Sequence, residues 1–178
     1  MASDTDEIAR YFDEFKIGSN VVKEKHLSLW LPPAIMVEIE GKLTERKYLL
    51  DVFAAQAWTT MRSAAAVQGV DIYALSTYRS IAYQATIIRN KLGRGQLIDD
   101  ILKVNAPPGY SEHHSARAID IGAPGFVDLE EDFEHSEAFR WLTKNAHEFN
   151  FSMSFPRDNI YGYAYEPWHW LFTAPSDT

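Results

Sequence analysis

Two polar stretches, far apart along the chain, carry histidines and carboxylates that would suit one shared metal ion. The first, residues 111–120, contains His113 and Asp120, and the second, residues 166–169, contains Glu166 and His169. Two imidazoles and one carboxylate form a common ligand set of catalytic zinc, and a further carboxylate can accept a proton from an attacking water. If both stretches serve one ion, the fold must bring them together.

The spacing of the first stretch requires a turn. His113 and Asp120 are seven positions apart, which is about 23 Å along a straight strand, whereas zinc ligands lie about 2 Å from the ion. The chain must therefore reverse between them, for instance as a loop that leads into a strand at residues 118–121. His114 is an alternative ligand that spacing alone does not exclude, and an isolated pair of this kind is more typical of a surface histidine and a turn aspartate.

The second stretch is Glu166-Pro167-Trp168-His169. Pro167 excludes a helix interior and suits the second position of a tight turn, which would bring Glu166 and His169 toward one centre. On its own, this piece is more typical of a buried, aromatic-rich turn.

Composition limits the possible partners and compartments. The chain has 178 residues, of which 46% are hydrophobic, so one domain with a core is expected. The lack of cysteine excludes thiolate zinc sites and cysteine nucleophiles, and a net charge of −8 argues against a nucleic-acid partner. The sequence contains no run of about 18 apolar residues, so no membrane span is predicted. The first 20 residues lack the features of an export signal, so we expect a cytoplasmic location.

Hydrophobic periodicity predicts alternating helices and short strands. Apolar residues at helical spacing favour helices over 6–16, 48–67, 80–92, 96–104 and 136–149, and short apolar runs favour strands over 36–39, 72–75, 118–121, 151–155 and 168–172. The acidic residues 128–137 are typical of a solvated loop. The pattern predicts a single α+β domain with helices packed on a small, mostly antiparallel sheet.

Two further polar residues lie near a predicted helix start. Arg79 precedes a helix that Ser80 can cap, a position suited to a carboxylate or a developing oxyanion, although a surface arginine paired with an acid is equally expected. Gln84 lies on the apolar stripe of that helix, where its amide needs a partner, either a buried backbone group or the edge of a cleft. Trp168 could wall a peptide pocket, but core packing is its default role.

Four motifs follow one another along the chain. They are Ser76-Thr77-Tyr78-Arg79-Ser80 with Gln84, Ser111-Glu112-His113, Ala118-Ile119-Asp120, and Tyr165-Glu166-Pro167-Trp168-His169-Trp170. In this order they resemble the zinc D-alanyl-D-alanine carboxypeptidases of the VanX/VanY type, whose fold and metal centre are shared with lysostaphin-type endopeptidases and hedgehog domains. The resemblance covers roughly residues 50–172, and we expect residues 1–45 to be an extension packed on a catalytic domain of residues 46–178. Two departures are Ala116, where glycine is usual, and Leu171, where arginine is frequent.

The resemblance implies a role for each candidate site residue. It implies one zinc ion per chain, Glu166 as the catalytic base, and Arg79 as the group that meets the substrate carbonyl or its developing charge. The zinc ligands that it implies are His113, Asp120 and His169, in preference to His114. The resemblance implies that Ser111 and Gln84 contact the peptide, and we also expect Tyr78 and Trp168 to bind the substrate.

The resemblance also implies a substrate, peptidoglycan stem peptides or muropeptides that end in D-alanine. Because we expect a cytoplasmic location, we favour an L,D-carboxypeptidase that acts on tetrapeptides in cell-wall recycling. The alternatives are a D,D-carboxypeptidase acting on pentapeptides, a phage-lysin-type endopeptidase, and a zinc-stabilised binding module. The presence of both Glu166 and Arg79 disfavours the binding module, which needs no general base.

Overall fold

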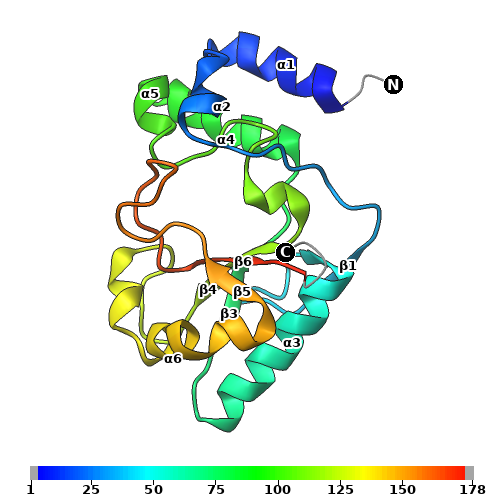
Figure 1. The fold of residues 1–178 in the computed structure, drawn as a ribbon, viewed down its shortest axis with the longest axis vertical. Helices are drawn as coiled ribbons and strands as arrows, with labels where there is room; N and C mark the ends of the chain where they lie inside the picture. The colour runs from blue at the N-terminus through cyan, green and yellow to red at the C-terminus, as the bar shows by residue number, and fades with distance from the viewer. Residues whose placement is uncertain (1–3, 175–178) are drawn as a thin grey trace.

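The computed structural model describes residues 4–174 of the chain (Figure 1). In chain order its elements are α1 (Asp4–Phe15), α2 (Asn20–Glu24), β1 (Met36–Ile39), β2 (Tyr48–Asp51), α3 (Val52–Val67), β3 (Tyr73–Ser76), α4 (Ile81–Gly93), α5 (Ile98–Ile101), the 3-10 turn η1 (Glu112–Ser115), β4 (Ala118–Gly122), η2 (Glu131–His135), α6 (Glu137–Asn145), η3 (Ala146–Phe149), β5 (Phe151–Met153) and β6 (His169–Phe172). None of these helices is long and apolar enough to cross a membrane.

A four-stranded sheet forms the centre of the molecule. Its strand order is β3-β4-β6-β5, and every neighbouring pair is antiparallel. Strands β1 and β2 form a separate antiparallel pair. Figure 1 shows α1, α2, α4 and α5 at one end of the molecule and α3 and α6 toward the other, with the sheet between them. The predicted α+β class with a small antiparallel sheet is confirmed.

Two hydrophobic clusters stabilise the two ends. The larger one packs α3 and α6 against the sheet, with Trp58, Met61 and Leu142 almost fully buried. The smaller one joins α1, α4 and α5 through residues such as Phe15 and Ile88. Burial of side chains of this size contributes about 1.5–3 kcal/mol each, so both clusters hold their elements in place.

The largest difference from the sequence prediction lies at residues 48–51, which form strand β2 rather than the first turn of a helix. Tyr48 and Leu50 alternate inward, as strand geometry requires, and both are buried. The Asp51 carboxylate then accepts hydrogen bonds from the backbone amides of Phe53 (3.0 Å) and Ala54 (3.4 Å), so α3 begins directly after it.

Other predicted elements are present with different ends. The helix expected over 96–104 is confined to Ile98–Ile101, and the last helix changes to 3-10 geometry at Ala146. The acidic residues 128–137 are not only a solvated loop, because residues 131–135 form η2 around the buried Phe133. Arg157 stabilises this turn through ion pairs with Glu131 (3.3 Å) and Glu134 (2.9 Å).

The N-terminal segment contacts helix α4 and the segment at residues 161–162. The Arg89 guanidinium on α4 forms two hydrogen bonds with the Glu14 carboxylate, and Lys25 Nζ donates to the carbonyl oxygens of Tyr161 (3.1 Å) and Gly162 (3.2 Å). The boundary between residues 45 and 46 stays a prediction. Residues 1–3 and 175–178, which belong to the predicted extension and domain, lie outside the described part.

Candidate active site

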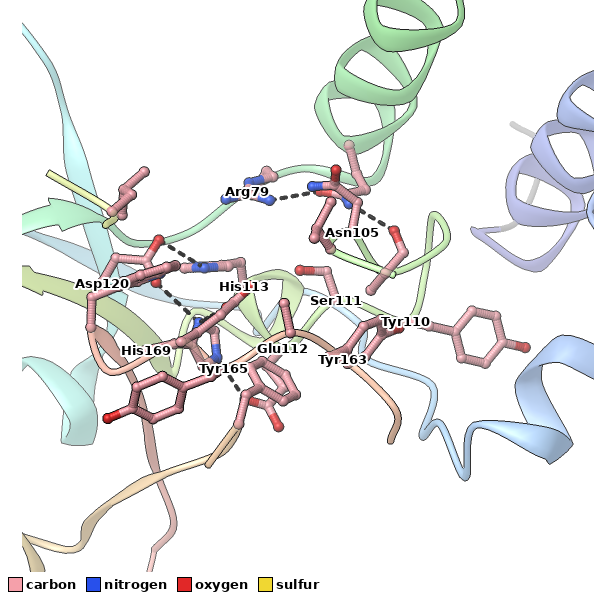
Figure 2. Close-up of a pocket in the computed structure, with 18 of the residues that line it drawn as sticks. Arg79, Asn105, Tyr110, Ser111, Glu112, His113, Asp120, Tyr163, Tyr165 and His169 are labelled. Carbon is pink, nitrogen blue, oxygen red and sulfur yellow. Dashed lines mark hydrogen bonds and ion pairs between the residues drawn. The ribbon is translucent and has the colours of Figure 1, made fainter. Parts of the chain in front are cut away.

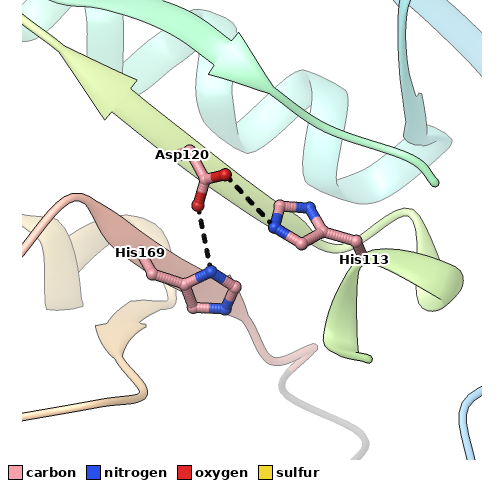
Figure 3. Close-up of side chains that lie close together, drawn as sticks. All are labelled: His113, Asp120 and His169. Carbon is pink, nitrogen blue, oxygen red and sulfur yellow. Dashed lines mark hydrogen bonds and ion pairs between the residues drawn. The ribbon is translucent and has the colours of Figure 1, made fainter. Parts of the chain in front are cut away.

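Strand register brings Asp120 and His169 together. In the β4–β6 pair, Asp120 lies directly opposite His169. Residues opposite each other on antiparallel strands have Cβ atoms about 5 Å apart, so their side chains meet on one face. Asp120 Oδ1 lies 3.0 Å from His169 Nδ1 (Figure 3).

His113 reaches the same point because the chain reverses just before β4. It lies in η1, and Ala116 then adopts the left-handed conformation with φ 54° before β4 begins at Ala118. This reversal places His113 Nε2 3.3 Å from Asp120 Oδ2. A left-handed residue costs about 1–2 kcal/mol when it carries a Cβ, which explains why glycine suits the position of Ala116.

His113, Asp120 and His169 form a compact, buried group whose ligand atoms all lie within 4.8 Å of one another. The remaining ring nitrogens have protein partners: His113 Nδ1 donates to the Thr77 carbonyl oxygen (2.7 Å) and His169 Nε2 to Glu112 Oε2 (2.8 Å). This leaves His113 Nε2 and His169 Nδ1 for a metal, and such outer partners are the usual way of orienting ligand histidines. The two nitrogens and one carboxylate therefore fit zinc.

Glu112 is the contributor that the sequence reasoning missed. Its side chain is buried, and its Oε2 also accepts a hydrogen bond from Ser154 Oγ (2.6 Å). Burial lowers the pKa of His169, but the hydrogen bonds and charges of Asp120 and Glu112 outweigh it and raise that pKa to about 10. A metal cation on Nδ1 would take the place of the proton that these carboxylates favour. The only sign of this role in the sequence is that Glu112 directly precedes His113, although the histidine that Glu112 contacts is His169.

Glu166 lies beside this group at the start of the predicted tight turn. The His169 amide donates to the Glu166 carbonyl oxygen (3.1 Å), which closes the turn with Pro167 in its second position, as predicted. Glu166 Oε2 lies 3.9 Å from His169 Nδ1. Burial raises the pKa of Glu166 to about 7, and the charges of nearby carboxylates add to this while His169 and Arg79 oppose it. A carboxylate with this pKa can exchange protons at neutral pH.

Arg79 approaches the group from the start of α4. Ser80 caps this helix by accepting a hydrogen bond from the Tyr83 amide (3.1 Å). Arg79 Nη1 donates to Gln84 Oε1 (2.8 Å), and Gln84 Nε2 donates to the Ala106 carbonyl oxygen (2.7 Å). Gln84 thus has a buried backbone partner and also holds the guanidinium, whose pKa burial lowers.

His114 points away from the metal group. Its Nε2 accepts a hydrogen bond from the Gly109 amide (3.1 Å), so Nδ1 carries the proton and donates to the Arg79 carbonyl oxygen (2.6 Å). Burial lowers its pKa to about 4, which keeps the ring neutral. His114 therefore ties η1 to the segment before α4.

A cavity of about 410 Å³ opens beside these residues (Figure 2). Ser111, Gln84 and Trp168 line it, together with Arg79, Glu166 and the three candidate ligands. Tyr78 is not among the lining residues, although it was expected at the substrate. Its backbone amide bonds to the Leu49 carbonyl oxygen, and the charges of Asp4 and Glu7 on α1 act on its side chain. Neighbouring residues of an extended segment point to opposite sides, so a cavity-facing Arg79 turns Tyr78 away.

Comparison with known proteins identifies relatives of this site. YodJ of Bacillus subtilis (strain 168), which is named as a carboxypeptidase, is 33% identical over 142 residues, covering 77% of this chain but 50% of the relative. The structure of the LD-carboxypeptidase LdcB superposes with a TM-score of 0.73 at 31% identity and covers 79% of this chain and 69% of that one. A variant of the vancomycin-resistance D,D-pentapeptidase VanY, in complex with Zn(II), has a TM-score of 0.63 at 25% identity, with coverages of 83% and 88%.

The chain spans about half the length of its Bacillus subtilis relative, so the shared region is one part of that protein. The family described as D-alanyl-D-alanine carboxypeptidase, VanY, matches residues 47–175, which include every residue of the candidate metal group. The protein therefore belongs to the VanY family of D-alanyl-D-alanine carboxypeptidases.

Proposed function

We propose that this protein is a zinc carboxypeptidase that releases terminal D-alanine from peptidoglycan stem peptides. The observation that carries the proposal is the grouping of three buried ligand atoms within 4.8 Å, beside a cavity that Glu166 and Arg79 also line. Membership of the VanY family and the Zn(II) complex of a related structure support the substrate and the metal.

Each residue has a distinct task in this proposal. His113, Asp120 and His169 would hold one zinc ion, which when bound supplies Lewis-acid polarisation of the scissile carbonyl and acidifies water. Glu166 accepts a proton from the attacking water and passes it to the leaving amine, and a pKa of about 7 suits both transfers. Arg79, held by Gln84, donates hydrogen bonds to the oxyanion that develops on the carbonyl oxygen.

Within this activity we favour L,D-carboxypeptidase specificity on tetrapeptides. The likeness to the LD-carboxypeptidase LdcB, at 31% identity over 79% of this chain, supports it. D,D-specificity on pentapeptides is the second candidate, supported by the likeness to the D,D-pentapeptidase. The proton transfers are the same in both, so the choice depends on the part of the cavity that receives the penultimate residue.

Matched substrates distinguish the two specificities. Zinc-loaded protein is incubated with a tetrapeptide and a pentapeptide of the same stem, and released D-alanine is measured by mass spectrometry. We expect efficient release from the tetrapeptide. Release from the pentapeptide alone would favour D,D-specificity. A cross-linked dimer of the same stem is a third substrate, and its cleavage without release of free D-alanine would point to an endopeptidase. If the protein binds zinc but cleaves none of the three substrates, a binding module is the remaining interpretation.

A further inference from the structure

One wall of the cavity carries a lysine that the proposed chemistry does not use. Lys91 lies on α4 seven residues after Gln84, and both side chains line the cavity. Residues at this spacing lie two turns apart on the same helical face. Lys91 Nζ donates to Asn105 Oδ1 (2.5 Å), and this half-buried ammonium has no ion-pair partner in the described part of the chain.

A continuous polar path connects this ammonium to Arg79. Arg79 bonds to Gln84, Gln84 bonds to the carbonyl of Ala106, and the adjacent residue Asn105 accepts from Lys91. Figure 2 shows Arg79 and Asn105 on one side of the cavity, across from Tyr163. The Lys91 ammonium therefore lies along the same wall as the guanidinium, where an extended peptide can contact both.

Lys91 is one of few cationic side chains in a cavity whose charged lining residues are mainly acids. Among the described lining residues, five are carboxylic acids and only Arg79 and Lys91 are permanently cationic side chains. Away from the metal group and Arg79, these acids would repel a carboxylate of the ligand unless a further cation faces it. Arg79 is already held by Gln84 next to the metal group, and burial lowers the pKa of Lys91, which indicates that its ammonium lacks full hydration.

We infer that Lys91, positioned by Asn105, binds a carboxylate group of the substrate. This inference rests on the proposed function. The free carboxylate of the terminal D-alanine is the first candidate, since a carboxypeptidase must distinguish a chain end from an internal peptide bond. A carboxylate on an internal residue of the stem has the same chemistry. An ammonium with two remaining donors can form charge-assisted hydrogen bonds with either.

Three peptides with the same sequence distinguish the two carboxylates. One has all carboxylates free, one has a C-terminal amide, and one has its internal carboxylates amidated. For Lys91→Met we expect kcat/KM on the free peptide to fall roughly 10- to 100-fold, mainly through KM, because one charged hydrogen bond is lost. Lys91→Arg should recover most of this. Lys103→Met is the matched control, because it removes the same charge from an exposed site outside the cavity.

The peptide that lacks the carboxylate bound by Lys91 should be the one that does not respond to Lys91→Met, and this identifies the carboxylate. If Lys91 binds the terminal carboxylate, the C-terminal amide is a poor substrate for the wild type and Lys91→Met worsens it no further, whereas the internally amidated peptide still responds. If it binds an internal carboxylate, the pattern is reversed. An equal loss on all three peptides, or no loss on any, would overturn the inference.

Binding to the Glu166→Gln variant keeps this test separate from the proposed function. The dissociation constant of the free peptide is measured for zinc-loaded Glu166→Gln with and without Lys91→Met, and we expect about 10-fold weaker binding in the double variant. If the wild type releases no D-alanine but this difference is found, the proposed function fails and the carboxylate site stands. If Lys91→Met leaves binding unchanged, or if the free peptide does not bind, the inference is wrong.

Discussion

Glu112 Oε2 lies 2.8 Å from His169 Nε2, on the side of the ring opposite to Asp120. A carboxylate that accepts from the outer nitrogen of a metal-ligating histidine fixes the tautomer and the ring orientation and makes the other nitrogen a better ligand. Glu112 directly precedes His113 in the chain, yet it contacts His169, the candidate ligand that is more distant in sequence. The 3-10 turn η1 thus contains one candidate ligand, His113, and orients a second one, His169.

The first prediction concerns this contact. Glu112→Gln should weaken zinc binding about 10- to 100-fold, because a neutral amide polarises the His169 ring less than a carboxylate does. Competition with a chromogenic chelator measures the affinity. Glu130→Gln removes the same charge from an exposed residue that also lines the cavity, and it should leave the affinity unchanged. Equal losses in both variants would mean that overall charge, and not the contact, is responsible.

Glu166→Gln should separate binding from catalysis. The amide keeps the size of the side chain but cannot accept a proton, so D-alanine release should fall about 10²- to 10⁴-fold. Elemental analysis should find the same zinc content as in the wild type, because Glu166 is outside the ligand group. Turnover close to the wild-type rate would assign the base to another residue.

The two neighbouring histidines should respond differently to substitution. His113→Ala should lose most of its zinc, whereas His114→Ala should retain it and lose stability. Removal of His114 leaves the Gly109 amide and the Arg79 carbonyl without their partner and creates a cavity, at a cost of about 2–4 kcal/mol in the free energy of unfolding. Urea denaturation measures this, with His147→Ala as an exposed control. Loss of zinc in His114→Ala would revise the ligand set.

The raised pKa of Glu166 predicts a pH-dependent stability in protein treated with a chelator. Its pKa is about 7 in the folded chain and 4.5 when unperturbed, so the native state binds more protons between these values. The stabilisation from protonated Glu166 is complete below about pH 4.5 and is lost as pH rises through 7. Between pH 4 and pH 8, the free energy of unfolding of Glu166→Gln should therefore rise by at most about 3 kcal/mol relative to that of the wild type. A constant difference, measured by urea denaturation, would contradict the assigned pKa.

Arg79→Ala should reduce kcat/KM by the equivalent of about 2–5 kcal/mol while the fold and the zinc content remain intact. Arg79→Lys should recover only part of the loss, because an ammonium cannot keep the planar contact with Gln84 and also face the substrate. Steady-state kinetics and circular dichroism check both statements. Arg94→Ala, an exposed arginine at the end of α4, is the control and should retain full activity.

Local sequence was sufficient for the features that depend on near neighbours. Ser80 predicted a helix start and Pro167 a tight turn, since a capping hydroxyl and a fixed φ act within a few residues. The apolar periods predicted most elements and the α+β class. The prediction failed at Tyr48–Asp51, where a four-residue strand next to a helix has too short a pattern to be distinguished from it.

Tertiary structure decided which of the polar side chains meet. The motif order indicated His113, Asp120 and His169 through a family resemblance, but their contact depends on the register between β4 and β6 and on the left-handed Ala116. The partner of Glu112 likewise depends on pairing between strands that are far apart in sequence. Hydrogen bonds between strands are made without regard to sequence distance, so a local pattern specifies which face a side chain occupies and only the folded sheet specifies its neighbour.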